Sequence, residues 1–357
     1  KFARVAMATN NVDMSSNTRP ELLPPLGEML GYQANTNSIW ELEQSKCFLV
    51  VSSNITEDQN VAAVPIKKAI KGGGASLIVI DARETELTRY ATMWLRPRPG
   101  SEAALLGGMI RTIVDESLDD HAFISTRCED VKSLRDSLWN FDLIRASRAT
   151  AIPQTQIQEA ARLFARSSPC AILYALETLP PHLRDACARV LVNLALITGN
   201  VGKPSAGLYA LFPGANEQGS RDVGCIPDYY PGYRPIADKD ARNELQRAWG
   251  VEKIPSESGL GIRDIAPAIS QGRLKALLVA GNIPRFANDE LGNFINAFKD
   301  LEYLVVQDTF ASEITEIADV VLPSATFAEK DGTYTNMERR VQLLRPAIGT
   351  IGDEEAD

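Results

Sequence analysis

CFLVVSSN, Cys47 to Asn54, is the stretch that decides the fold of this chain. An apolar run ends in small polar residues, which is typical of a buried strand that carries polar side chains at its carboxyl end. A second apolar run, SLIVIDARE, follows after a helical stretch and ends in Asp81. Strands that alternate with helices in this way predict a mostly parallel sheet covered by helices.

The same arrangement occurs a second time near the other end of the chain. ALLVAGN ends in Asn282, and EYLVVQD ends in Asp308. Asn54 and Asp81 are 27 positions apart (81 − 54), and Asn282 and Asp308 are 26 apart (308 − 282). The matching order and spacing predict two related α/β units, each with an Asn and an Asp at the carboxyl edge of its sheet, where open α/β sheets bind ligands.

Further elements are predicted between these two copies. CAILYAL, Cys170 to Leu176, has the composition of a buried strand. Ser101 to Glu116 and Pro153 to Ser167 have helical periodicity, with Ser101 as a plausible N-cap and Pro153 in a first turn. The triplet Gly72 to Gly74 is expected to end a helix, because glycine favours that position. We therefore predict an α/β fold made of two related αβα domains with mostly parallel sheets.

Composition excludes several classes of function. The 357 residues are enough for two domains, and the net charge of -9 leaves no basic stripe for nucleic acid. No apolar run approaches the ~20 residues that span a bilayer, so direct membrane insertion is not expected. The five cysteines are widely spaced, so neither an iron-sulfur ligand set nor a disulfide framework can be drawn from them. His121 and His182 lack ligand spacing, so no metal site is predicted, and the thiols are expected to be reduced in the cytoplasm.

The strand-end carboxylates suggest what the two edges bind. An Asp in this place can accept two hydrogen bonds, from ribose hydroxyls or from the N1 and N2 edge of a guanine. No GxGxxG loop is present, which disfavours an ordinary NAD site. The alternative is that Asn and Asp only cap the following helices, but the duplication favours two nucleotide-like sites. The glycine-rich stretch Thr198 to Gly224 is either a binding loop or a crossover between domains, and the sequence leaves both open.

Six stretches carry a resemblance that runs nearly end to end. They are SNITE (Ser53 to Glu57), LIVIDARETEL (Leu77 to Leu87), RPGSEAALL (Arg98 to Leu106), NLALITGNVGKPSAG (Asn193 to Gly207), GANEQGSRDVG (Gly214 to Gly224) and ADVVLPSATFAEKDGTYTNMERRVQ (Ala318 to Gln342). Together they resemble the molybdopterin oxidoreductase family. The branches that look most similar are the formate dehydrogenase large subunit and the G subunit of bacterial NADH-quinone oxidoreductase (complex I).

The resemblance implies two bound molybdopterin guanine dinucleotides, one for each α/β unit. Contacts to one dinucleotide would come from Ser53, Asn54, Glu57, Asp81, Arg83, Gly100 and Glu102. Contacts to the other would come from Gly281, Asn282, Gln307, Asp308 and Ser324.

The resemblance also implies how the domains are divided. The first domain, residues 14–205, would be inserted into the second, which consists of residues 1–13 and 206–344, and residues 345–357 would begin a linker. An iron-sulfur region before Lys1 and a barrel after Asp357 are expected, so iron-sulfur clusters are expected only outside this sequence.

One loop departs from the family pattern. In TNNVDMSSNTRP, Thr9 to Pro20, the positions at which formate dehydrogenases carry an Arg, the metal-binding Cys or selenocysteine and a His read Asn17, Arg19 and Pro20. Arg offers no soft donor and Pro no proton, so neither can replace its counterpart. A substrate Arg is likewise replaced by Phe212, and a pterin-contacting segment reads ALETLP, residues 175–180.

These losses favour a catalytically silent subunit of the complex I type: an electron-transfer scaffold with a degenerate molybdenum site, no metal, and at most a retained molybdopterin guanine dinucleotide or guanine nucleotide. Its partners would be the NADH-oxidising flavoprotein and iron-sulfur subunits of an NADH-quinone oxidoreductase at the inner face of the membrane. The alternative is a divergent formate dehydrogenase alpha subunit that oxidises formate at a bis-molybdopterin guanine dinucleotide metal centre. A free-standing nucleotide-binding module is a third class.

Overall fold

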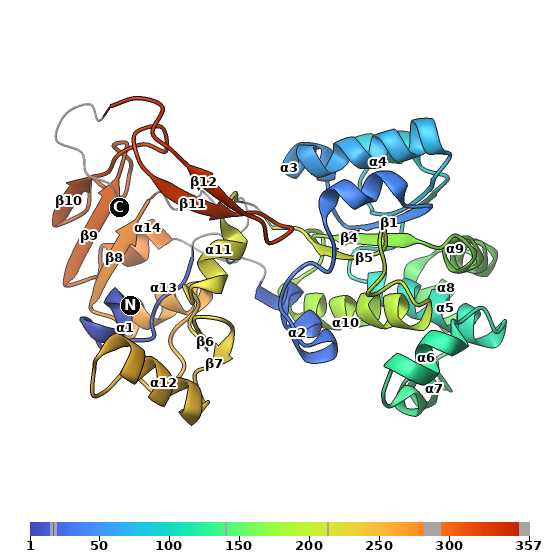
Figure 1. Ribbon diagram of the computed structural model, residues 1–357, viewed down its shortest axis with the longest axis horizontal. Helices are drawn as coiled ribbons and strands as arrows, with labels where there is room; N and C mark the ends of the chain where they lie inside the picture. The colour runs from blue at the N-terminus through green and yellow to red at the C-terminus, as the bar shows by residue number, and fades with distance from the viewer. Residues whose placement is uncertain (15–16, 18–19, 140, 213, 282–293, 350–357) are drawn as a thin grey trace. The chain divides into compact units, whose positions relative to one another are not determined.

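The computed structural model describes residues 1–14, 17, 20–139, 141–212, 214–281 and 294–349. The chain forms two compact units, each of which appears in Figure 1. The first α/β unit consists of residues 19–213 together with residues 337–339. The second α/β unit consists of residues 1–18, 214–336 and 340–357.

The first α/β unit is built on a five-stranded sheet of order β3-β2-β1-β4-β5, and every neighbouring pair is parallel. The strands are β1 (Cys47–Val51), β2 (Ser76–Ile80), β3 (Met93–Leu95), β4 (Cys170–Tyr174) and β5 (Gly207–Ala210). All residues of β1, β4 and β5 are buried, as expected for a parallel sheet covered on both faces. The strands predicted from CFLVV, SLIVI and CAILYAL are therefore confirmed.

Helices cover both faces of this sheet (Figure 1). The helices and turns are η1 (Pro20–Leu22), α2 (Pro24–Leu30), η2 (Ile39–Gln44), α3 (Ile55–Asp58), α4 (Asn60–Gly73), η3 (Glu86–Tyr90), α5 (Glu102–Asp115), α6 (His121–Arg127), α7 (Val131–Trp139), α8 (Leu143–Thr150), α9 (Gln154–Arg166) and α10 (Pro181–Ile197). One core lies between the sheet and α4. The other lies between the sheet and α5, α9 and α10.

The ends of these helices test three sequence predictions. Gly74 ends α4 with a φ of 66°, so the predicted role of the glycine triplet is confirmed. Ser101 does precede α5, but its hydroxyl donates to the carbonyl of Arg98 at 2.6 Å and so does not cap the helix. Pro153 stands just before α9 instead of inside its first turn, and its φ of -57° suits that N-cap position.

The second α/β unit has a three-stranded parallel sheet of order β10-β9-β8. Its strands are β8 (Ala276–Ala280), β9 (Tyr303–Asp308) and β10 (Val320–Pro323), and two hairpins add β6 (Tyr229–Tyr230) with β7 (Arg234–Pro235) and β11 (Gly332–Thr335) with β12 (Val341–Leu344). Its helices are α1 (Phe2–Val5), α11 (Glu217–Asp222), α12 (Lys239–Trp249), α13 (Ile262–Ser270) and α14 (Phe294–Phe298). Helices α13 and α14 pack on the sheet through an apolar cluster that includes Val279, Leu304 and Val306.

The internal repeat is visible as the same pair of hydrogen bonds in both units. In the first unit, Thr92 N–H donates to Leu77 O at 2.8 Å, and Leu77 N–H donates to the Thr92 hydroxyl at 3.0 Å. In the second, Asp319 N–H donates to Leu304 O at 2.9 Å, and Leu304 N–H donates to the Asp319 carboxylate at 2.7 Å. Both pairs stand at the same offsets from the strand-end aspartate, so the two copies share strand register as well as sequence order.

The one-residue difference between the copies lies at the end of the first strand. Strand β1 ends at Val51, three residues before Asn54, whereas β8 ends at Ala280, two residues before Asn282. The strands of the two copies therefore align with each other, and the first copy has one additional residue between the end of its strand and Asn54. Asn282 itself lies outside the described residues.

The chain crosses between the two units later than the resemblance implied. The implied boundary fell after Ser205, but β5 pairs in parallel with β4, with Gly207 opposite Ala171, and therefore belongs to the first unit. The glycine-rich stretch supplies this strand and α11 and is not a featureless loop. Among the described residues, no helix combines the length and apolarity needed to cross a membrane.

Candidate functional site

The carboxyl edge of the first unit's sheet gathers buried polar side chains. Ser53 and Asn54 follow β1, Asp81 follows β2, and Glu102 begins α5. Asp81 and Glu102 are 0% exposed, and Ser53 is 2% exposed. Fully buried carboxylates are uncommon unless a partner satisfies them, so this edge is the strongest candidate for a ligand site in the unit.

Glu102 is incompletely satisfied by the protein. Its Oε1 accepts weak hydrogen bonds from the hydroxyls of Ser52 (3.5 Å) and Thr178 (3.4 Å). Its Oε2 is buried and has no hydrogen-bond partner among the described residues. Burial raises the pKa of Glu102, and the charge of Asp81 adds to the shift, although hydrogen bonds from the backbone of Glu102 and Gly100 and from the Thr178 side chain oppose it. A hydrogen-bond donor from a ligand would remove the cost of leaving this oxygen unpaired.

Asp81 is held by Arg83. The backbone N–H of Arg83 donates to Asp81 Oδ1 at 2.8 Å, and its Nε lies 3.4 Å from the same oxygen. The Arg83 guanidinium also reaches Glu177 at 3.2 Å. One cation therefore contacts two carboxylates, and a third carboxylate, Glu102, lies nearby. Because carboxylates accept hydrogen bonds, the edge favours ligands that donate them, such as a guanine ring or ribose hydroxyls.

Three residues of this edge were not predicted as site residues. Ser52, Glu177 and Thr178 contact the predicted set, and the last two follow β4. The segment that contains these two, residues 175–180, was interpreted only as a departure from the family pattern. The signal that identifies them is the parallel pairing of β4 with β1, because parallel neighbours end at the same edge of a sheet.

Two more residues predicted to contact the first dinucleotide, Glu57 and Gly100, are close in sequence to residues of this edge. Glu57 is exposed on α3, the short helix that follows Asn54. Gly100 has a φ of 87°, and a Cβ there would approach the Leu183 side chain at 3.2 Å. A larger residue at Gly100 would therefore be both strained and crowded.

The equivalent edge of the second unit brings together its own predicted residues. Gly281 N–H donates to Gln307 O at 2.7 Å, and Ser324 N–H donates to Asp308 O at 3.1 Å. The Asp308 carboxylate accepts the N–H of Thr309 at 2.7 Å. Ser324 is buried, whereas Gln307 and Asp308 are partly exposed, so this edge is more accessible than that of the first unit.

Two described residues of the loop that departs from the family pattern, Asp13 and Asn17, take part in a polar network within the second unit, and Asn17 is buried. Asn17 Nδ2 donates to Asp13 at 2.7 Å, and Arg221 Nη2 donates to Asn17 Oδ1 at 2.6 Å. Arg221 also forms an ion pair with Glu217 at 2.9 Å. Asp13 further accepts the first N–H of α13, from Ile262, at 2.7 Å. The network joins the loop to α11 and α13.

Three other positions differ from the residues expected for the family, and two of them lie in the described part of the chain. Arg19 lies outside the described residues. Pro20 begins η1, where its fixed φ suits a helical first turn. Phe212 packs partly buried against a core of the first unit, and its carbonyl accepts a hydrogen bond from Gln59. Pro20 and Phe212 therefore have structural roles.

Asp13 is a carboxylic acid of this network whose pKa depends on its burial. Burial raises its pKa to about 6, although hydrogen bonds from Ile262, Asn17 and Met14 oppose the shift. The folded protein therefore binds this proton more tightly than the unfolded chain does. The contribution of Asp13 to stability is fully present below about pH 4 and is lost as the pH rises through about 6, by up to about 3 kcal/mol.

We expect Asp13→Asn to remove this pH dependence, because Asn carries no titrating proton. The difference in free energy of unfolding between wild type and variant should change by up to about 3 kcal/mol between pH 4 and pH 7 and be flat above that. Urea unfolding at several pH values measures it. Asp240→Asn, on the exposed side of α12, is the control. A pH slope that persists unchanged in Asp13→Asn contradicts the assignment.

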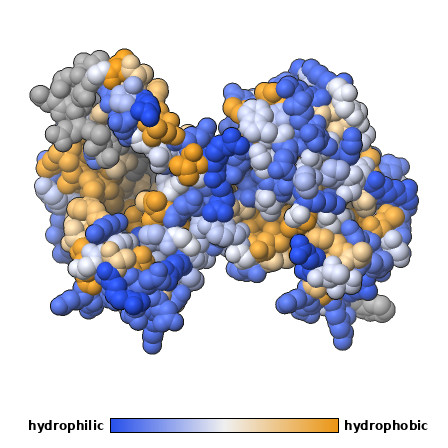
Figure 2. Space-filling view, in the orientation of Figure 1, coloured by the Kyte–Doolittle hydropathy of each residue, from blue (hydrophilic) through white to orange (hydrophobic). Residues whose placement is uncertain are grey.

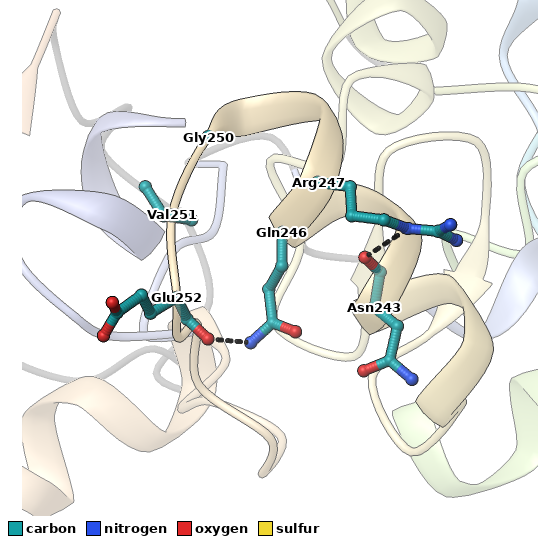
Figure 3. A pocket seen from close by; sticks show the side chains of 6 residues that line it. All are labelled: Asn243, Gln246, Arg247, Gly250, Val251 and Glu252. Carbon is teal, nitrogen blue, oxygen red and sulfur yellow. Dashed lines mark hydrogen bonds between the residues drawn. The ribbon is translucent and has the colours of Figure 1, made fainter.

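A surface hollow of about 510 Å³ lies beside the end of α12 (Figure 3). Gln246 donates to the carbonyl of Glu252 at 2.8 Å across it, and Arg247 donates to the carbonyl of Asn243 at 3.4 Å. These bonds close the end of the helix, and the hollow contains none of the residues predicted from the sequence. It is a helix terminus and not a candidate site.

Metal ligands are scarce in the part of the chain that the structure describes. No group of three or more His, Cys, Asp or Glu side chains is arranged to hold a metal ion there. The five cysteines are free. Burial raises the pKa of Cys128, Cys187 and Cys225, so these thiols do not provide a ready thiolate.

The chain belongs to the molybdopterin oxidoreductase family, whose model matches residues 2–357. It is 36% identical to the F420-dependent formate dehydrogenase subunit alpha of Methanocaldococcus jannaschii and 32% identical to formate dehydrogenase H of Escherichia coli. Each match covers 100% of this chain but only 52% and 50% of the relative, respectively. The chain thus spans about half the length of these curated relatives.

The fold is shared with a solved structure of another enzyme. The acetylene hydratase from Pelobacter acetylenicus superimposes with a TM-score of 0.71 at 20% identity, over 96% of this chain and 49% of the other. This likeness concerns the fold, and it confirms the predicted α/β class with parallel sheets. Among the functional interpretations, the similarity to formate dehydrogenase subunits supports the formate dehydrogenase type, and nothing specifically supports a subunit of complex I.

Proposed function

We propose that this chain is the dinucleotide-binding part of a formate dehydrogenase alpha type subunit. The carboxyl edges of its two sheets would each hold one molybdopterin guanine dinucleotide. The observation that carries the proposal is the buried pair Asp81 and Glu102, in which Glu102 Oε2 lacks a partner among the described residues. The N–H groups of a guanine are donors of the kind this pair requires.

The polar side chains at the carboxyl edge of the first unit's sheet fit such a ligand. Asp81 and Glu102 would accept from the guanine or ribose, while Ser53, Asn54 and Arg83 would meet polar or phosphate groups. In the second unit, the equivalent dinucleotide would be served by Gln307, Asp308 and Ser324. When bound, the cofactor supplies the redox chemistry of formate oxidation, and the residues of this chain bind and orient it. Partner subunits with flavin or iron-sulfur centres would carry the electrons onward.

Nucleotide content tests the proposal directly. We expect the protein purified from a host that makes the cofactor to contain guanine nucleotide, measured by acid extraction and mass spectrometry. Asp81→Asn combined with Glu102→Gln should lower the total content by about half, from about two guanine nucleotides per chain to about one, because charge-assisted hydrogen bonds that contribute about 1.5–3 kcal/mol each are lost in the first unit alone. Glu84→Gln, an exposed residue of the same loop, is the control. Unchanged nucleotide content in the double variant would exclude these two carboxylates from binding.

A second function is favoured by one observation. Arg19 and Pro20 stand where the resemblance places a metal ligand and a proton acceptor, and Asn17 is engaged by Asp13 and Arg221. On this alternative the chain keeps the dinucleotides but serves only as an electron-transfer scaffold. Metal analysis and formate-dependent dye reduction separate the two functions. Stoichiometric molybdenum or tungsten with activity supports formate dehydrogenase, and nucleotide without metal supports the scaffold.

A further inference from the structure

Two cysteines lie side by side on neighbouring strands of the first unit's sheet. Cys47 is the first residue of β1, Cys170 is the first residue of β4, and the two are partners in the parallel register of these strands. Both belong to the core formed with α5, α9 and α10, so they lie on the same face of the sheet. Neighbouring strands are about 4.8 Å apart, and a disulfide requires roughly 4.4–6.8 Å between its Cα atoms. The backbone therefore places these thiols where a disulfide can form once the side chains turn toward one another.

Neither thiol is exposed to solvent. Cys47 and Cys170 are each 0% exposed. Figure 2 shows largely hydrophilic surface over α3 and α4, which cover one face of the sheet, and the two thiols belong to the core on the other face. A hydrogen bond with the Cys47 thiol and burial both raise the pKa of Cys170. The Cys170 thiol is therefore protonated in the folded core and in contact with its neighbour.

The pair lies close to the surface at the amino edge of the sheet. Lys46, immediately before Cys47, is exposed, and so is Ser168, two residues before Cys170. The Lys203 ammonium donates to the Ser168 hydroxyl at 2.7 Å. The contact with Cys47 and burial dominate the pKa of Cys170, but the charge of Lys203 opposes both. Local opening of this edge would therefore bring the Cys170 thiol to solvent beside a cation that favours the reactive thiolate.

The Cys170 thiol also closes the end of α9. Its Sγ donates to the carbonyl of Ser167 at 2.6 Å and to the carbonyl of Phe164 at 3.2 Å. Carbonyl groups at the end of a helix have no partner within the helix, so a donor from elsewhere stabilises them. A thiol has a single proton, and oxidation of the sulfur removes it. A change in the oxidation state of Cys170 should therefore alter the last turn of α9.

We propose that Cys47 and Cys170 are a site of reversible oxidation, at which a small peroxide converts the two thiols into a disulfide. One thiol reduces the peroxide, releases water and becomes a sulfenic acid, and the other thiol attacks that sulfur and releases a second water. Two thiols and one hydrogen peroxide thus give one disulfide and two waters, and two electrons pass from sulfur to oxygen. The second thiol prevents further, irreversible oxidation of the first. The proposal does not depend on the cofactor or on formate chemistry.

Treatment of the folded protein with hydrogen peroxide tests the proposal. After free thiols are blocked, a digest under non-reducing conditions should yield the peptide of Cys47 joined to the peptide of Cys170, and dithiothreitol should separate them. Cys128, which is only partly buried, shows in the same digest that the peroxide has acted. Cys187→Ala, at a buried cysteine of α10, is the matched control and should form the same linked peptide. Amide hydrogen exchange at the end of α9 should be faster in the oxidised protein than in the reduced protein.

A variant without the second thiol separates the two steps. In Cys47→Ala the sulfenic acid formed at Cys170 has no thiol beside it, so dimedone, which reacts with sulfenic acids, should label Cys170 in this variant and not in wild type. The digest of wild type needs no variant and decides the matter if Cys47→Ala does not fold. A linked peptide that appears only after unfolding in urea overturns the proposal, because the folded core would then exclude the peroxide. So does a pair that stays reduced while Cys128 is oxidised, or a disulfide that joins other cysteines.

Discussion

Arg221→Met is expected to lower the free energy of unfolding of the second α/β unit by about 3–5 kcal/mol, because it leaves one charge of a buried ion pair without its partner. The side chains of Arg221 and Glu217 are 3% and 5% exposed, and their atoms approach to 2.9 Å. The substitution also removes the donor to Asn17, which lies 204 positions away in the sequence. Urea unfolding followed by tryptophan fluorescence measures the loss.

Two further variants make this expectation specific. Replacing both partners, Arg221→Met with Glu217→Leu, should recover most of the loss, because no buried charge then remains unpaired. Arg234→Met, at an ion pair whose side chains are 33% and 61% exposed, should change stability by at most about 1 kcal/mol. If the double variant is as unstable as Arg221→Met, the cause is lost packing and not the unpaired charge.

Gly259→Ala is expected to destabilise the same unit by about 3 kcal/mol or more. A Cβ at this position would lie 1.9 Å from the carbonyl oxygen of Asn10 and 2.6 Å from the amide nitrogen of Asn11. Both are backbone atoms, so no side chain can turn aside to make room. The loop that begins at Thr9 packs directly on this glycine, and Leu260 N–H donates to the Asn11 side chain at 2.8 Å.

The control for this steric prediction is another glycine of the same unit. At Gly332 an added Cβ meets nothing within 4 Å, and the backbone is not in the left-handed region. Gly332→Ala should therefore leave the Tm within about 1–2 °C of wild type, whereas Gly259→Ala should lower it several times as much. Equal effects at the two positions would falsify the steric explanation.

The elements that the sequence predicted correctly are those with strong local patterns. Strands β1, β2, β4, β8 and β9 are short apolar runs, and each was located from that pattern. The duplicated spacing of Asn and Asp was also sufficient to predict two related sheets and their carboxyl edges. Strand β5 was missed because Gly207 to Ala210 lies inside a glycine-rich stretch with little periodicity, and only its pairing with β4 makes it a strand.

The same distinction applies to the residues of the candidate site, some of which were predicted from the sequence and some of which were not. Asp81 and Glu102 were reached from their place after a strand and through the family resemblance. Glu177 and Thr178 were missed as site residues because their contacts depend on how β4 is placed beside β1. A sequence pattern describes neighbours along the chain, whereas these contacts join segments that are 94 and 76 positions apart.

The sequence by itself determined the α/β class, the internal repeat and the polar strand ends, because strand periodicity and spacing are local properties of the chain. Tertiary structure alone decided which apolar positions of that repeat are buried. Leu49 and Leu278 occupy the same place in similar strands, yet one is 0% exposed and the other 49% exposed. Burial depends on what packs against a strand from elsewhere in the fold, and no local pattern contains that information. For the same reason, only the structure shows that Arg221 joins Asn17 and Asp13 in one buried network.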